Sequence, residues 1–111
     1  DWIIFRGQSG MIPRRICIRN GRASSAIRSL ELWIGSSLNE DVFYKLAETV
    51  SDIKRGVEEK RSIDLVLLDY TDYFVARNWS KFDLLKLSIV DNWGWSRCNE
   101  FFEFEVFGDL Q

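Results

Sequence analysis

Apolar and polar residues alternate along much of the chain, and this period of two predicts β-strands. The first such segment, Trp2–Phe5, stops at a glycine-containing loop. A second strand is expected only beyond Pro13, because proline cannot donate to a central ladder. The Asn20-Gly21 pair that follows it predicts a tight hairpin turn, since both residues tolerate positive φ.

The third predicted strand, from about Ala26 to Ile34, has one apolar face and one mixed face. The apolar face consists of Leu30, Leu32 and Ile34. The other face consists of Ser29, Glu31 and Trp33. Because Trp33 points away from the expected core, it is a candidate contact residue.

Beyond Gly35 the apolar spacing changes from two to three or four residues. Ser37 and Glu40 have the spacing of a helix capping box. The pattern predicts one long amphipathic helix over about residues 40–60. Its apolar stripe consists of Phe43, Leu46, Val50, Ile53 and Val57.

The remainder of the chain returns to period two. It predicts strands at residues 63–68, 82–90 and 100–107, with a further strand or a short helix at 73–76. In the last strand, alternation places Phe102, Phe104 and Val106 on one face and Phe101 on the other. The chain is expected to form a single α+β domain over residues 1–111. It would consist of a mainly antiparallel sheet of about six or seven strands with the one long helix packed on it.

The chain of 111 residues contains no histidine. Histidine is the usual general base near neutral pH, the usual partner of a Ser or Cys nucleophile and the commonest metal ligand. We therefore expect no enzyme activity, no catalytic residues, no metal site and no cofactor. The expected chemistry is recognition.

The cysteines and the hydropathy pattern bear on the compartment. Cys17 and Cys98 lie far apart and form no short metal or redox motif. Two reduced thiols are the preferred interpretation, with a single long-range disulfide as the alternative. No run of about 18 apolar residues is present, so no membrane span is expected and the cytoplasm is the default location.

The net charge of −2 conceals an uneven distribution. Residues 1–38 carry six arginines and two acidic residues, a net +4, whereas residues 39–111 carry a net −6. The arginines could contact the phosphates of a nucleic acid, or they could cover the solvent face of a sheet or pair with the acidic C-terminal strands. A pI near 5.2 disfavours nucleic acid as the partner.

Two further groups of side chains are candidates for binding. Asp69, Tyr70, Asp72 and Tyr73 join carboxylates and tyrosines directly after a predicted strand. Tyrosine is enriched at binding hot spots, although a plain polar turn is the alternative. The second group consists of the carboxylates Glu103 and Glu105, on one face of the last strand.

Three tryptophans, Trp79, Trp93 and Trp95, form a separate aromatic cluster. They could stack on bases or sugars, or they could close one end of the core. Stacking on bases belongs to the nucleic-acid alternative.

Residues 82–96 resemble part of the small immunity proteins of bacterial polymorphic-toxin systems. Some of those proteins carry a strand that runs into an Asp-Asn-x-Gly-Trp turn, matched here by Asp91, Asn92, Gly94 and Trp95. The variable position, often proline in the family, is Trp93 here. The chain is also similar to contact-dependent growth inhibition immunity proteins in being small, acidic and rich in aromatic residues.

The resemblance implies a cytoplasmic protein that binds a cognate toxin domain, expected to be basic and often a nuclease, and occludes its active site. The expected contact residues are Asp69, Tyr70, Asp72, Tyr73, Glu103, Glu105 and Trp33. A nucleic-acid-binding module that uses the N-terminal arginines is the alternative.

Overall fold

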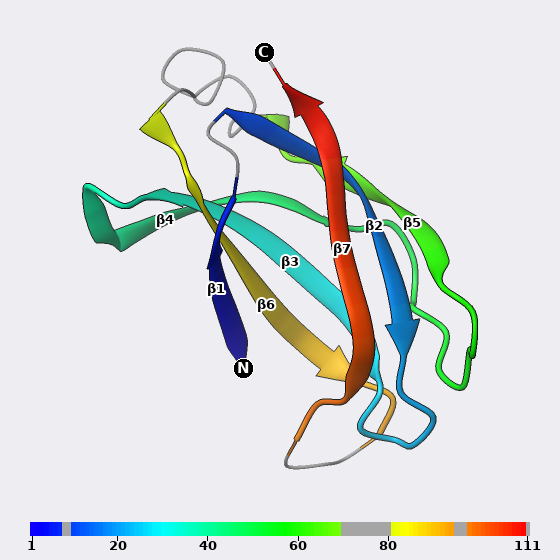
Figure 1. The fold of residues 1–111 in the computed structure, drawn as a ribbon. Helices are drawn as coiled ribbons and strands as arrows, with labels where there is room; N and C mark the ends of the chain where they lie inside the picture. The colour runs from blue at the N-terminus through cyan, green and yellow to red at the C-terminus, as the bar shows by residue number, and fades with distance from the viewer. Residues whose placement is uncertain (8–9, 70–80, 95–97, 111) are drawn as a thin grey trace.

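The structure, a computed structural model, describes residues 1–7, 10–69, 81–94 and 98–110. These residues form the strands β1 (Trp2–Arg6), β2 (Met11–Asn20), β3 (Ile27–Ser36), β4 (Asn39–Thr49), β5 (Arg61–Leu67), β6 (Leu84–Asn92) and β7 (Phe101–Leu110) (Figure 1). They join in one sheet in the order β1-β6-β3-β4-β5-β2-β7, and every ladder is antiparallel. The described residues therefore form an all-β fold: the α+β prediction is wrong, whereas the mainly antiparallel sheet is confirmed.

The sheet curls into an open half-barrel, so that strands from its two ends pack on one apolar core (Figure 1). Phe104 and Val106 of β7 pack against buried residues contributed by strands across the sheet. The edge strands β1 and β7 do not pair with each other, which leaves the half-barrel open between them. The buried residues of the main core are Ile16, Ile18, Ile27, Leu30, Leu32, Ala47, Ile53 and Leu87.

The helix predicted over about residues 40–60 is wrong, because β4 and its connection to β5 occupy this stretch. A β-bulge in the β3–β4 ladder explains the misleading pattern. It allows the consecutive residues Leu46 and Ala47 to be fully buried together. The bulge interrupts the period of two, and the apolar spacing becomes three or four.

The connection between β4 and β5 also contributes to the helix-like pattern. Val50 is 58% exposed and takes no part in the core, whereas Ile53 is fully buried. The Ile53 N–H donates a hydrogen bond of 2.8 Å to the carbonyl oxygen of Arg28. Ile53 therefore fills the core from a loop that is tied to β3.

The predicted capping box is instead the turn of the β3–β4 hairpin, where Ser36 pairs with Asn39. The backbone N–H of Ser37 donates to Asp83 Oδ1 at 2.8 Å, and its hydroxyl donates to Asp83 Oδ2 at 2.6 Å. These two hydrogen bonds lower the pKa of the Asp83 carboxyl below its usual value. Ser37 thus fixes a hairpin turn to the segment that precedes β6.

The Asn20-Gly21 pair does not form the predicted hairpin, because β2 pairs with β5 and β7 rather than with β3. The Asn20 side chain is 1% exposed and makes four hydrogen bonds. Its Nδ2 donates to the carbonyl oxygens of Ile27 at 2.7 Å and Lys54 at 3.2 Å. Its Oδ1 accepts from the N–H groups of Gly21 at 2.9 Å and Ile27 at 3.0 Å. Asn20 therefore joins the end of β2 to β3 and to the β4–β5 connection.

Register shifts in the β2–β7 ladder change two further expectations. β2 begins before Pro13, which lies at the first shift, where a missing N–H is tolerated. The second shift, between Arg19 and Asn20, alters the alternation expected in β7. Phe101 consequently packs against the core, whereas Phe102 is 57% exposed.

Cys17 is half-buried on β2 and Cys98 is exposed, and no disulfide joins the two. In the part of the chain that the structure describes, no helix is long and apolar enough to cross a membrane.

Replacing Asn20 with alanine is expected to destabilise the fold by about 3 kcal/mol or more, because several buried backbone groups would lose their partners. Urea denaturation followed by tryptophan fluorescence measures the change. Asn39→Ala, at an exposed position, is the matched control and should cost less than about 0.5 kcal/mol. A loss of stability in Asn20→Ala no larger than in the control would contradict the role assigned to this side chain.

Candidate binding surfaces

Charged side chains cover the outer face of β5, β2 and β7. Alternation along β2 turns Arg15 and Arg19 outward, and the antiparallel registers place Asp64 opposite the first and Glu103 opposite the second. Arg15 Nε lies 3.1 Å from Asp64 Oδ1, and Arg19 Nη1 lies 3.3 Å from Glu103 Oε1. The charges on this face therefore alternate in sign across neighbouring strands.

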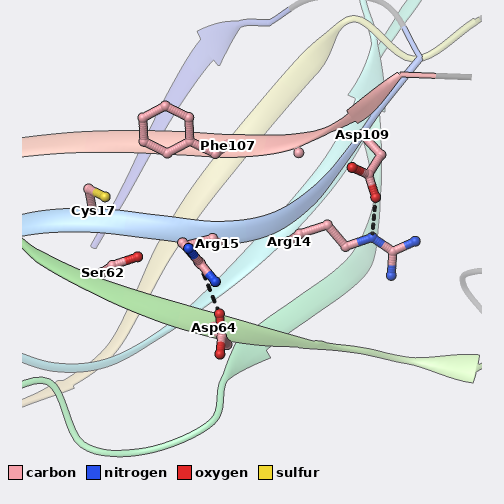
Figure 2. Close-up of a pocket in the computed structure, with 8 residues that line it drawn as sticks. Arg14, Arg15, Cys17, Ser62, Asp64, Phe107 and Asp109 are labelled. Atoms are coloured by element: carbon pink, nitrogen blue, oxygen red, sulfur yellow. Dashed lines mark hydrogen bonds and ion pairs between the residues drawn. The ribbon is translucent and has the colours of Figure 1, made fainter.

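A shallow hollow of about 490 Å³ lies on the same face (Figure 2). Figure 2 shows the guanidinium groups of Arg14 and Arg15 turned toward Asp109 and Asp64, respectively. The Arg14 Nε to Asp109 Oδ2 distance is 3.1 Å. All four side chains are about half exposed or more, so each pair contributes little stability. The hollow is lined by Arg14, Arg15, Cys17, Ser62, Asp64, Phe107, Gly108 and Asp109.

Lys60 lies between the two predicted contact residues of β7. Its Nζ is 2.8 Å from Glu103 Oε2 and also contacts Glu105 Oε1. The hydrogen bond from Lys60, with the nearby charge of Arg19, lowers the pKa of the Glu103 carboxyl. The two glutamates do share one face, as alternation predicts, but cations of the same chain already neutralise them.

Each arginine of residues 1–38 forms an ion pair with an acidic residue of residues 39–111. Beyond the three described above, the pairs are Arg6–Asp83 at 3.8 Å, Arg22–Glu58 at 2.6 Å and Arg28–Asp52 at 3.1 Å. Arg14 and Arg19 pair with the C-terminal strand β7 as the sequence suggested, whereas the other four arginines pair with carboxylates elsewhere in the chain. A phosphate would have to compete with a carboxylate for every one of these guanidinium groups.

A second surface lies on the outer face of β6, β3 and β4, where Trp33 is half-buried. Lys86 stands directly opposite Trp33 in the β3–β6 register, and its Nζ lies 5.6 Å from the centroid of that ring. The same ammonium lies 5.3 Å from each of the Trp2 and Phe43 rings. Three aromatic rings thus surround one cation, an arrangement that holds Trp33 in place through cation–π attraction.

Carboxylates lie beside Trp33 on this surface. Glu31 and Glu48 face each other in the β3–β4 register, and both contact Lys45, which is 3.0 Å from Glu48 Oε2. Their hydrogen bonds raise the pKa of the Lys45 ammonium. Two carboxylates share one ammonium, so the immediate surroundings of Lys45 keep an excess negative charge, whereas Lys86 on the other side of Trp33 is a second cation of the same surface. Val90 beside the carboxylates is 57% exposed. We refer to Trp33, Glu31, Lys45, Glu48 and Val90 as the Trp33 face.

The remaining predicted contact residues are not brought together by the described structure. Asp69 is exposed just after β5. Tyr70, Asp72 and Tyr73 lie outside the described residues. The predicted cluster at the end of β5 is therefore represented only by Asp69.

The tryptophan cluster is likewise represented by one member, because Trp79 and Trp95 lie outside the described residues. The indole N–H of Trp93 donates to the carbonyl oxygen of Ile53, and the Arg28 guanidinium lies 5.2 Å from the ring centroid. Trp93 is therefore engaged within the chain, which fits the interpretation that it closes the core.

The sequence contained part of the signal for the Trp33 face. Alternation in β3 places Glu31 on the same side as Trp33, so this carboxylate could have been included. Lys45 and Glu48 were missed because the bulge in β4 made their segment resemble a helix.

Replacing Lys60 with methionine is expected to raise the pKa of Glu103 toward its ordinary value. The lowered pKa in the wild type contributes stability that is present above the ordinary carboxyl pKa and is lost as the pH falls through the folded value. Lys60→Met should therefore be less stable than the wild type near neutral pH, and the difference should shrink in acid. NMR titration of the side-chain carboxyl carbons measures the pKa. Lys54→Met, in the exposed β4–β5 connection, should leave it unchanged.

Comparison with known proteins identifies no family: no protein-family model matches the chain, and no curated protein matches it.

Proposed function

We propose that this chain is a cytoplasmic immunity protein that binds a cognate bacterial toxin domain and occludes its active site by protein–protein contact. The observation that carries the proposal is the Trp33 face, which combines a half-buried tryptophan, an exposed valine and an excess carboxylate on a sheet surface. Tryptophan is enriched among residues that dominate binding energy.

The support of Trp33 suits it to act as an anchor. Trp33 is fixed from one side by Lys86 and lies next to Lys45 in the β3–β4 register. A side chain that is already ordered loses little conformational entropy when a partner covers it. The partner would bury the exposed part of the ring without first having to order it.

The charge around Lys45, on the β4 side of Trp33, suits a basic partner. Glu31 and Glu48 outnumber the one ammonium that they contact. A toxin that acts on nucleic acid needs a cationic groove for the phosphates, and carboxylates placed there would block substrate entry. Glu103 and Glu105 suit this role less well, because Lys60 and Arg19 would have to release them.

The segment that resembles immunity proteins is part of the same sheet. It begins just before β6 and includes all of that strand, which runs beside β3. After β6, Asn92 Oδ1 accepts a hydrogen bond of 3.2 Å from the Gly94 N–H, which orders the first part of the Asp-Asn-x-Gly-Trp turn. The resemblance and the proposed contact surface thus concern adjacent strands.

The test is binding to the product of the gene immediately upstream, which the proposal expects to carry a toxin domain, measured by isothermal titration calorimetry. Trp33→Ala should weaken binding by about 2 kcal/mol, roughly 30-fold, because the anchor is lost. Glu48→Lys should slow association, and the effect should diminish at high salt.

Phe107→Ala is the matched control, because Phe107 is also an aromatic residue but lies on the outer face of β7, where it is 49% exposed. It should change binding by less than about 0.5 kcal/mol. Absence of any complex with the toxin would contradict the function. A complex that tolerates Trp33→Ala but not Phe107→Ala would place the contact on the other outer face.

A further inference from the structure

One edge of the half-barrel is apolar, and no strand among the described residues pairs with it. β1 forms the end of the sheet, so only its side toward β6 is paired. Trp2, Ile3 and Ile4 are 62%, 44% and 46% exposed, although all three are large apolar residues. A free strand edge with such side chains is a template for pairing with another strand.

The hydrogen bonds to β6 show which residues of β1 face its free edge. The carbonyl oxygen of Asp1 accepts from the Ile89 N–H at 3.0 Å, and the Gly7 N–H donates to the Asp83 carbonyl oxygen at 2.7 Å. In an antiparallel ladder the direction of the backbone groups alternates from residue to residue. The N–H and C=O groups of Trp2, Ile4 and Arg6 therefore point away from β6, toward the free edge.

The two edges of the sheet differ in their protection. The outer face of β7 carries Glu103 and Glu105, and register shifts interrupt its ladder with β2. The ladder of β1 is continuous from Trp2 to Arg6, without a proline, a lysine or a bulge. Charged side chains on the edge strand, bulges and prolines are common means of preventing strand addition. Of the two edges, β1 is the one open to pairing.

We propose that β1 pairs with β1 of a second copy of this chain, antiparallel and about a two-fold axis at Ile4. In this register Ile4 lies opposite Ile4 of the second copy, and Trp2 lies opposite Arg6 of the second copy. Trp2, Ile4 and Arg6 are the residues whose backbone groups point toward the free edge, and in this register each pairs with another of the three. Their N–H and C=O groups therefore satisfy one another. The contact is isologous and closes, so it yields a dimer rather than a fibre.

The side chains in this register explain why a second copy fits the edge. On the outer face, a guanidinium from each copy meets the Trp2 ring of the other, a favourable cation–π pair. On the inner face, Ile3 lies opposite Phe5 of the second copy, an apolar pair of the kind that stabilises sheets. No like charges oppose each other.

An apolar groove of about 210 Å³ adjoins the inner face of β1. It lies between the two edge strands, because both β1 and β7 contribute to its walls. Pairing places the inner side chains of the second copy at the rim of this groove, so more apolar surface is removed from water than the strands alone would bury. The groove is lined by Ile3, Phe5, Leu87, Phe101, Phe104 and Val106.

Sedimentation velocity of the 111-residue chain over a range of concentrations tests the proposal. The wild type should form a dimer that dissociates on dilution. Ile4→Lys and Ile4→Glu should each weaken dimerisation at least ten-fold, because residue 4 opposes itself and two like charges would meet. An equimolar mixture of the two variants should restore the dimer, because a lysine then opposes a glutamate.

Val66→Lys is the matched control, since Val66 is an apolar residue of β5 with 42% exposure, lies far from β1 in the strand order and does not belong to the Trp33 face. It should dimerise like the wild type. A monomeric wild type at every concentration would overturn the proposal and leave the edge to a strand of another protein. A dimer that survives Ile4→Lys, or a mixture that stays monomeric, would overturn the proposed register. None of the substituted residues belongs to the Trp33 face, so a failure of dimerisation and a failure of toxin binding can be distinguished.

Discussion

The buried carboxamide of Asn20 is the interaction on which the shape of this molecule depends. Its two donors and its oxygen join the end of β2, the start of β3 and the β4–β5 connection. A side chain that was 1% exposed and had no partners would be costly, so these three segments are held in one arrangement. Asn20 thus links the end of β2 to β3 at a point where the two strands do not pair in the sheet.

Ion pairs on the outer faces have a different role. The positive first third and the negative remainder of the chain meet in the strands and in the connections between them, where each arginine of residues 1–38 contacts a carboxylate. Exposed pairs of this kind add little stability individually. They do oppose wrong registers, since a shift of β7 along β2 would change which charges face each other. The apolar core supplies the stability, and the charges help to select the pairing.

Alternation in the sequence predicted the strands in which it was uninterrupted. β1, β3 and β6 were recognised within a few residues, and the predicted inward positions Leu30, Leu32 and Ile34 are buried as expected. The failures occur where the alternation is broken. The bulge at Leu46 and Ala47 gave the sequence a helix-like apolar spacing. The Asn20-Gly21 pair was interpreted as a hairpin turn, although Asn20 is a buried hydrogen-bonding residue.

For the candidate surfaces, the sequence likewise predicted the direction of side chains but not their contacts. The outward direction of Trp33 follows from alternation alone. The neutralisation of Glu103 by Lys60 does not, because it depends on which distant segments the sheet order brings together. Local patterns determine the direction of a side chain within its strand, whereas its neighbours are determined by non-local pairing.

The strand order also has a consequence for how the chain acquires its structure. β2 is flanked by β5 and β7, so neither of its neighbours in the sheet is adjacent to it in sequence. Closing such distant pairs carries a large loss of chain entropy before contacts can compensate, which makes folding slow. On the ribosome, β2 would emerge long before residues 101–110 and would remain unpaired on one side until their synthesis. During that interval its isoleucines Ile12, Ile16 and Ile18 are the segment that a chaperone would have to shield.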